Sequence, residues 1–499
     1  MTSQLSPQLI LFILIGYFLM LILISYLTSR GSSDNHSFFM AKRQSPWYLI
    51  AIGMIGTSIS GVTFISVPGW VEARSMSYMQ TVFGFLLGYT VISFVLMPMY
   101  YKLNLISIYT YLEKRFGTAS YKTGSAFFLL SRTIGSGFRL YLAAMVMHQF
   151  VTSPFGIPFW LTVAITIGLI WSYTFKGGVK TIIWTDLIQT LCLITTLVMT
   201  LYIIGDRLGL DISGIIRTVT ESPKSQIFFF ENGWSDAKNF FKQFLAGASI
   251  CIVMSGLDQD IMQKNLTVKT LRGAQINMMS YGALLAFINL LFLVLGILLF
   301  MYAKQNNIAI PIVNGTPRTD LLFPTIALNY STPLIGVLFF LGLLASTYAS
   351  ADSALTALTT AFCIDFLGFQ KKETQEEKTH TTRTLVHLGF SVFLFFIIIL
   401  FYIINDSSVI EAIYKAAGYT YGPLLGLFAF GFLTKKKIRD HLAPYICIAS
   451  PILTYIINQN SEAWFNGYKF DFEILILNGL IAFLGLWAIS TNEKLEDFH

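Results

Sequence analysis

Long apolar segments recur along the whole chain, and they are the feature that most limits how it can fold. About 20 apolar residues in an α-helix cross the ~30 Å of hydrocarbon in a bilayer. Hydrophobic residues make up 55% of the 499 residues and charged residues only 12%, which is outside the range of soluble globular domains. We therefore predict an all-α polytopic membrane protein in which residues 1–499 form a single membrane domain. Its expected spans, about 13 transmembrane helices, are 7–29, 46–72, 78–101, 123–152, 157–175, 181–205, 240–258, 274–302, 333–366, 385–404, 409–433, 441–458 and 470–490.

One of these segments is repeatedly interrupted. Residues 51–71 read AIGMIGTSISGVTFISVPGWV, in which Gly and Pro break the apolar run and Ser and Thr hydroxyls line it. A broken helix leaves backbone carbonyls without intrahelical donors, and inside a bilayer those carbonyls need another partner, such as a cation. Interrupted helices near the midplane are typical of the binding sites of secondary transporters. The alternative is an intact helix that uses small residues for close packing.

A second unusual segment lies five spans later. Residues 244–257 are apolar for only ~14 residues before the polar stretch DQDIMQKN begins. Short or interrupted helices at matching positions of two halves indicate an inverted repeat around a central site. We therefore predict a first repeat at 46–205 and a second at 240–433. Peripheral helices would then occupy 7–29 and 441–490.

The distribution of charge predicts the orientation of the chain. Most of the 33 Lys and Arg residues fall in alternate loops, so the positive-inside rule puts the N-terminus outside and the C-terminus in the cytoplasm. We expect a plasma (inner) membrane protein with the lipid bilayer as its surroundings. The net charge of +7 is scattered over separate loops, which argues against a nucleic-acid partner.

The motifs that are missing from the sequence narrow the function. No GxxxxGK[ST] phosphate-binding loop occurs, so ATP hydrolysis is not expected and an ion gradient is the expected driving force. No nucleophile–base constellation is visible either, so we do not expect an enzyme. An ion channel and a sensor that has lost transport are further alternatives.

Four charged residues lie at membrane depth, where charges are costly and usually functional. Asp186 and Asp352 are in the sixth and ninth spans, and Arg132 and Arg139 are seven residues apart on one face of the fourth. Structural ion pairs are the alternative for these residues. In the ninth span, small and hydroxyl residues recur on one helical face, namely Ser346, Ala349, Ser350 and Ser353. Hydroxyls and broken-helix carbonyls suit a hard monovalent cation such as sodium, although the same serines would also serve close packing.

Four motifs together resemble the sodium/solute symporters, the family of the sodium/glucose, sodium/proline and sodium/sialic acid cotransporters. They are GGVKTIIWTDLIQ at 177–189, LDQDIMQK at 257–264, ADSALTALTTAFCIDF at 351–366 and YTYGPLLGLFAFG at 419–431. The second departs from the family pattern DQxxxQR, because Lys264 replaces Arg. The resemblance covers nearly the whole chain and implies a leucine-transporter-type fold with two inverted five-helix repeats.

The resemblance also implies where cations bind. The family's shared sodium site corresponds to Gly56, Ile59, Ser346, Ala349 and Ser350. Ala349 departs from the pattern, because the family usually has a hydroxyl residue there, so one ligand oxygen is missing. Some members bind a second sodium, and the matching positions here are Asp186, Asp352 and Ser353. Two unpaired carboxylates at that depth would need a cation between them, or a proton on one of them.

The substrate site implied by the resemblance is closest to that of the sialic acid transporters. The pattern SISGVTFISVP would put substrate contacts on Ser58, Ser60 and Thr63, with Gln80 on the next helix. An arginine for a substrate carboxylate is expected on the following core helix, and Arg132 and Arg139 lie one turn before and one turn after the family position. The Glu and Gln of the glucose-type pattern are absent, which argues against a neutral sugar.

The sequence thus predicts a sodium-coupled secondary symporter that imports a small organic solute by alternating access. Sialic acid or another carboxylate is the expected solute, and sodium is the expected bound ion. Two alternatives remain, a sodium-coupled sugar or amino-acid symporter and a proton-coupled transporter of the same fold that would use Asp186 or Asp352.

Overall fold

The computed structural model describes residues 7–29, 44–174, 178–231, 233–313, 316–369, 376–404 and 409–494. Nearly all regular structure is α-helix, as expected for a chain whose backbone polar groups must be satisfied within the lipid-facing segments. The helices are α1 (Pro7–Ser29), α3 (Trp47–Ser58), α4 (Gly61–Arg74), α5 (Tyr78–Val91), α6 (Met97–Lys102), α7 (Thr110–Arg115), α8 (Thr118–Met147), α9 (Phe159–Thr174), α10 (Gly178–Arg207), α11 (Ile212–Glu221), α12 (Phe240–Cys251), α13 (Gln259–Asn265), α14 (Leu271–Gln305), α15 (Leu322–Thr325), α16 (Pro333–Ala361), α17 (Glu376–Ile404), α18 (Val409–Thr420), α19 (Gly422–Leu433), α20 (Ala443–Gln459), α21 (Ser461–Trp464) and α22 (Ile474–Ala488).

Short elements extend or connect these helices. Within the described residues, five π-helical turns continue the preceding helices, namely η2 (Ile92–Leu96), η3 (His148–Thr152), η6 (Ile252–Gly256), η8 (Ile326–Tyr330) and η9 (Phe362–Phe366). The 3₁₀ turns η4 (Ser153–Phe155), η5 (Pro223–Ser225), η7 (Thr319–Leu321) and η10 (Asp440–Leu442) lie in connections. Two antiparallel strand pairs complete the described structure, β1 (Ile312–Val313) with β2 (Thr316–Pro317) and β3 (Lys436–Ile438) with β4 (Ser490–Lys494).

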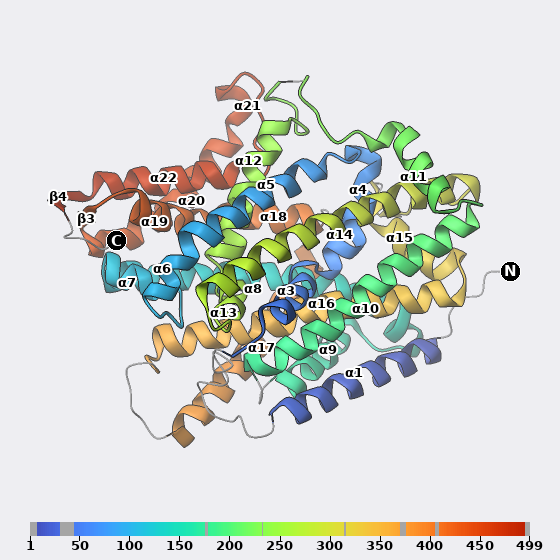
Figure 1. Cartoon of the computed structure of the whole chain (residues 1–499), viewed down its shortest axis with the longest axis horizontal. Coiled ribbons are helices and arrows are strands. Elements are labelled where there is room, and N and C mark those ends of the chain that lie inside the picture. The colour runs from blue at the N-terminus through green and yellow to red at the C-terminus, as the bar shows by residue number, and fades with distance from the viewer. Residues whose placement is uncertain are drawn as a thin grey trace.

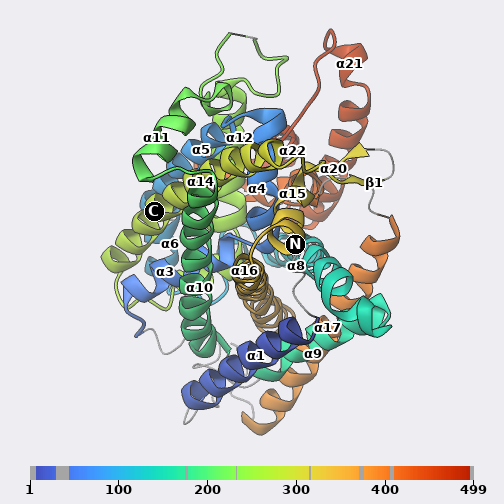
Figure 2. The ribbon, with the colours of Figure 1, turned by 90° about the vertical axis from the view of Figure 1, so that its right-hand side faces the viewer.

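The long helices form a bundle whose centre is α16. Most of these helices run along the longest dimension of the molecule, with β3 and β4 at one end and α11 and α15 at the other (Figure 1). Viewed from the side, α16 lies near the middle, and α1 and α17 lie at the edge (Figure 2). In the most apolar stretch of α16, 78% of the residues are buried. The corresponding share is 28% for α17 and 33% for α1. α16 packs against α3, α4, α8 and α10, so these helices form its immediate surroundings.

Three apolar spans are broken and bent. α3 and α4 meet at 65°, and the segment Phe240–Gly256 meets α13 at 66°. A third pair, Ala412–Thr420 with α19, bends by 46°. The first two are the interrupted segments that predict an inverted repeat, and they bend by nearly the same angle. The repeats at 46–205 and 240–433 stay a prediction.

The number of membrane spans depends on how the bent helix pairs are counted. In the part of the chain that the structure describes, seven helices are long and apolar enough to cross a membrane, and the number rises to ten if each bent pair is one span. α9 and α22 are shorter apolar helices, and α8, which carries Arg132 and Arg139, is not among the spans found by length and hydropathy. Every one of the thirteen expected segments contains helix, but the count of thirteen as membrane spans stays a prediction.

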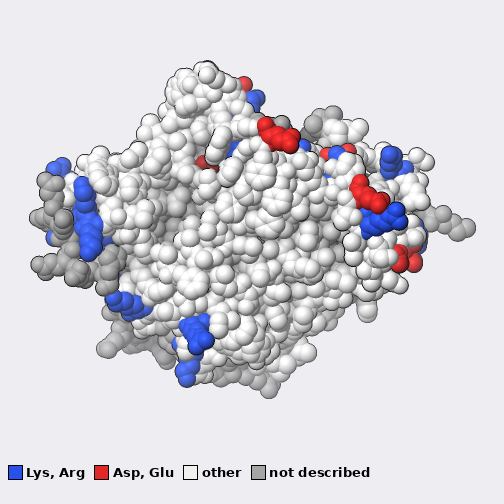
Figure 3. Space-filling view, turned by 45° about the horizontal axis from the view of Figure 1, so that its top comes forward, with Lys and Arg blue, Asp and Glu red and all other residues white. Residues whose placement is uncertain are grey.

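The surface agrees with a bilayer environment. On the face drawn in Figure 3, charged side chains lie towards the margins, and the broad middle carries none. Large apolar side chains are exposed on the helices that cover the bundle, for example Phe12 at 74% on α1 and Ile403 at 72% on α17. Lipid contact would cover such side chains, since exposed apolar patches of this extent are rare in soluble monomers.

Candidate functional site

The backbone is non-helical between α3 and α4, in the middle of the bundle. Ile59 (φ −81°, ψ 85°) and Ser60 (φ −74°, ψ 168°) have non-helical backbone angles, so the helical hydrogen-bond ladder stops there. The carbonyls just before such a stop lack helical donors. Gly56, one turn earlier, lies so close to its neighbours that an added Cβ would be 2.5 Å from Thr190 Oγ1 and 3.5 Å from Ala349 Cβ. The broken helix therefore contacts α10 and α16 directly.

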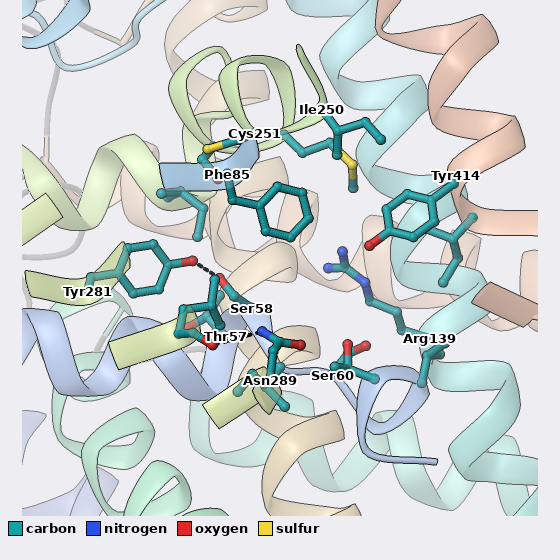
Figure 4. A pocket seen from close by; sticks show the side chains of 18 of the residues that line it. Thr57, Ser58, Ser60, Phe85, Arg139, Ile250, Cys251, Tyr281, Asn289 and Tyr414 are labelled. Carbon is teal, nitrogen blue, oxygen red and sulfur yellow. Dashed lines mark hydrogen bonds between the residues drawn. The ribbon is translucent and has the colours of Figure 1, made fainter. Parts of the chain in front are cut away.

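A cavity of about 100 Å³ adjoins this break (Figure 4). The broken helix lines it with Ser58, Ile59, Ser60 and Thr63, which includes the three hydroxyl residues predicted to contact substrate. Aromatic and apolar side chains from other helices face them, namely Phe85, Ile250, Met254, Tyr281 and Tyr414. The Ser58 and Tyr281 hydroxyls are hydrogen-bonded to each other, which ties the broken helix to α14 at the cavity wall.

The two arginines of α8 both line this cavity, as their shared helical face predicts, but their partners differ. Arg132 is 4% exposed and forms an ion pair with Asp260, with Asp258 3.8 Å away. Arg139 points towards the cavity (Figure 4) and donates a hydrogen bond to Ser350 Oγ, at 3.1 Å from Nη1. Among the described residues, no carboxylate lies within 4.0 Å of Arg139. Arg139 is therefore the arginine that is available to an anionic ligand.

The residues predicted for the shared sodium site lie along the contact between α3 and α16. Ser346, Ala349 and Ser350 are buried on α16, and Gly56 packs against Ala349 as described above. Ser346 Oγ donates to the Leu343 carbonyl in its own helix, which leaves its lone pairs available to a cation. The structure thus places the backbone carbonyls at the end of α3 next to the face of α16 that carries the two serines. Whether sodium binds there stays a prediction.

One premise of the predicted second sodium site is wrong. Asp186 is not an unpaired carboxylate, because Lys264 Nζ lies 2.5 Å from Asp186 Oδ2. Thr57 Oγ1 donates to the same oxygen at 3.0 Å, and Lys264 also contacts Thr57. Lys264 lies in the polar stretch that follows the short apolar segment 244–257, yet its side chain is only 4% exposed. The ammonium supplies the positive charge that Asp186 was expected to need from an ion.

The other two residues of that predicted site have different partners. Asp352 accepts a hydrogen bond from the Tyr173 hydroxyl at 3.0 Å, and no basic side chain within the described ranges lies within 4.0 Å of it. Ser353 donates to Asp260, the carboxylate that pairs with Arg132. Of the two carboxylates in that predicted site, Asp352 is therefore the one without a cationic partner among the described residues.

Gln80 does not line the cavity described above, although the sequence places it in the substrate site. Its amide nitrogen donates to the Lys238 carbonyl at 2.8 Å and to Gln243 Oε1 at 3.0 Å. Its amide oxygen accepts from the Phe229 backbone N–H at 3.1 Å. Gln80 is fully buried and ties α5 to the loop before α12. Its donors and acceptors are therefore already occupied in this structure.

Several residues at the site carry little signal in the sequence and were not predicted. Tyr281 and Asn289 on α14 line the cavity but lie in an ordinary apolar run. Thr190 accepts from the Gly56 N–H at 2.9 Å and is an isolated threonine on α10. Lys264 belongs to the motif LDQDIMQK, which resembles a family pattern, but the motif does not indicate that Lys264 pairs with Asp186.

Comparisons with known proteins agree with this geometry. A family model described as the sodium:solute symporter family matches residues 38–440. A sodium/sialic acid symporter of Aliivibrio fischeri is 24% identical and covers 82% of this chain and 79% of its own length. One from Proteus mirabilis is 23% identical over 85% of this chain and 84% of its own length.

Solved structures show the same fold. The substrate-bound outward-open state of a Na⁺-coupled sialic acid symporter has a TM-score of 0.80 at 20% identity and covers 97% of this chain and 99% of its own. Mhp1, a nucleobase-cation-symport-1 family transporter, has a TM-score of 0.53 at 14% identity, with 91% and 93% covered. The predicted leucine-transporter-type fold is confirmed by these neighbours. With the broken helix, the cavity and the match over 38–440 taken together, the chain belongs to the sodium:solute symporter family, and sodium is its coupling ion.

Proposed function

We propose that this symporter imports a small organic anion that bears a carboxylate, and that sialic acid is its solute. The observation that carries the proposal is Arg139, a guanidinium at the cavity without a carboxylate partner among the described residues. Arg139 is half-buried, so its guanidinium has lost part of its hydration without gaining a counter-charge. A planar guanidinium suits bidentate pairing with a carboxylate. A neutral sugar would leave that charge uncompensated.

The rest of the cavity suits a polyhydroxylated acid. Ser58, Ser60 and Thr63 offer hydroxyls from the broken helix, and Asn289 adds an amide. Phe85, Ile250 and Met254 give an apolar wall for the ring or an alkyl substituent of the solute. The sodium/sialic acid symporters among the relatives support sialic acid over other acids. A sodium-coupled sugar or amino-acid symporter is the competing assignment.

Sodium would bind where the break meets α16, with ligands from Gly56, Ile59, Ser346 and Ser350, and with Ala349 supplying no side-chain oxygen. A second cation would bind at Asp352 and Ser353, beside the Asp186–Lys264 pair. The support for it is the net charge of this layer. Asp186 with Lys264 is neutral, Arg132 faces both Asp258 and Asp260, and Asp352 has no basic partner in the described ranges. Protonation of Asp352 is the alternative.

We also propose that the N-terminus is outside the cell and the C-terminus in the cytoplasm, in the plasma (inner) membrane. The end of the bundle with α6, α7 and β3 contains Lys102, Arg115 and Lys436, as the positive-inside rule expects of a cytoplasmic end. In Figure 3 the margin at that end shows Lys and Arg, while the opposite margin shows both signs of charge.

Uptake by the purified protein in liposomes tests the solute. N-acetylneuraminate should accumulate under an inward sodium gradient, and unlabelled carboxylates should compete better than neutral sugars of similar size. Arg139→Gln should lose most of this uptake, whereas Arg217→Gln, which removes an arginine that is 79% exposed on α11, should keep it. If glucose or an uncharged amino-acid amide is the best substrate and Arg139→Gln transports it normally, the carboxylate assignment is wrong.

A further inference from the structure

Arg139 touches both the solute cavity and the predicted sodium site. The guanidinium lines the cavity, and in Figure 4 it points into it on the side of Tyr414. The same guanidinium donates to Ser350 Oγ at 3.1 Å, and Ser350 is one of the hydroxyls expected to hold sodium. Ser350 itself is 1% exposed, so water does not screen this contact well. A single side chain therefore connects the two ligands of the transport cycle.

The predicted sodium site depends heavily on Ser350. Ala349 offers no side-chain oxygen, so of the three α16 residues in this predicted site only Ser346 and Ser350 carry a hydroxyl. An oxygen that coordinates a hard cation lies ~2.4 Å from it. Because Arg139 donates to the same oxygen at 3.1 Å, a sodium ion on Ser350 would lie close to a second positive charge. In a site with little water, repulsion between like charges at this separation lowers the affinity for the ion.

We propose that Arg139 makes the sodium site depend on an anionic solute: it rests on Ser350 while the cavity is empty and moves to the solute carboxylate when the cavity is filled. The move is favourable because a guanidinium–carboxylate pair is charge-assisted at both ends, whereas a serine hydroxyl is a neutral acceptor. Once the carboxylate neutralises Arg139, Ser350 is free to bind sodium. The proposal rests on the proposed function in that the solute carries a carboxylate.

Two consequences follow from thermodynamic linkage. If the anion strengthens sodium binding by a given factor, sodium strengthens binding of the anion by the same factor. A neutral solute of similar size would leave Arg139 on Ser350 and would not raise the affinity for sodium. Arg139 would therefore determine which solutes are coupled to the ion, in addition to contributing to their binding.

The first test needs no organic solute. Sodium is titrated into the purified full-length protein in detergent, with choline keeping the ionic strength constant, and the dissociation constant is measured by calorimetry. Arg139→Gln removes the positive charge next to Ser350, so it should bind sodium about 10-fold more tightly or better, within the usual range of coupling between sites. Arg139→Lys keeps the charge and should stay near wild type, and Arg217→Gln controls for the loss of an arginine elsewhere. Equal or weaker sodium binding in Arg139→Gln would overturn the proposal.

The second test uses the wild-type protein, so it does not depend on any Arg139 variant. Saturating N-acetylneuraminate should lower the sodium dissociation constant of the wild type by about 10-fold, and a neutral sugar should not. An unchanged constant with the anion bound would refute the coupling. If N-acetylneuraminate does not bind at all, the solute assignment fails, and the solute-free comparison above still decides the role of Arg139.

Discussion

The ion pair between Asp186 and Lys264 gives a prediction whose magnitude follows from its burial. The two side chains are 1% and 4% exposed, and their charged atoms lie 2.5 Å apart. Asp186→Asn would leave the Lys264 ammonium buried without a counter-charge, which costs about 3–5 kcal/mol of folding stability. Lys264→Met should cost a similar amount for the opposite reason. Removing both charges in Asp186→Asn/Lys264→Met should cost much less than the sum, because no isolated charge remains.

The assay is a double-mutant cycle of reversible denaturant unfolding in detergent. Potassium replaces sodium throughout, since a bound ion would stabilise the folded state by mass action. The coupling energy between the two positions should be at least about 2 kcal/mol. Arg217 and Glu221 form a matched exposed pair, 79% and 64% exposed, and Arg217→Gln should cost about 0–1 kcal/mol. Additive effects of Asp186→Asn and Lys264→Met would refute the claim that the two charges compensate each other.

Three further predictions concern transport and packing. Ser350→Ala removes one of two hydroxyls from the predicted sodium site, so uptake at a fixed sodium gradient should fall about 10-fold or more, and unchanged sodium dependence would exclude Ser350 as a ligand. Asp352→Asn should lower the number of ions moved per solute, measured from the reversal potential in proteoliposomes; an unchanged ratio would leave Asp352 as a structural or proton-carrying group. Gln80→Leu should reduce stability by about 1–3 kcal/mol, because it leaves the Lys238 carbonyl and the Phe229 N–H without their partner, while the apparent KM for the solute stays near wild type. A large rise in KM with unchanged stability would instead indicate that Gln80 contacts the substrate.

Patterns along single helices predicted much of this protein correctly. Apolar length placed the helices, and Gly, Ser and Thr marked the break that the structure puts between α3 and α4. The spacing of Arg132 and Arg139 put both on one face, and both line the same cavity. These predictions succeed because helical geometry relates residues within a few turns regardless of the rest of the fold.

Contacts between helices could not be read from the chain. Lys264 lies 78 residues from Asp186 in the sequence, and nothing local to either residue indicates that they pair. Gln80 was assigned to the substrate by resemblance, but its rotation about α5 turns it towards Lys238 and Gln243. Which of the two arginines already has carboxylate partners depends on Asp258 and Asp260, which belong to a different broken span.

The general reason is that a buried charge needs a partner, because its removal from water is costly. The function of such a charge therefore depends on which group pairs with it. Sequence spacing shows that a charge is buried and on which helical face it lies. The packing of α3, α8, α10, α13 and α16 around one another decides which charges neutralise each other and which remain for a ligand. In this protein that packing leaves Arg139 and Asp352 without an ionic partner within the described ranges, and these two residues are where an anion and a cation are expected to bind.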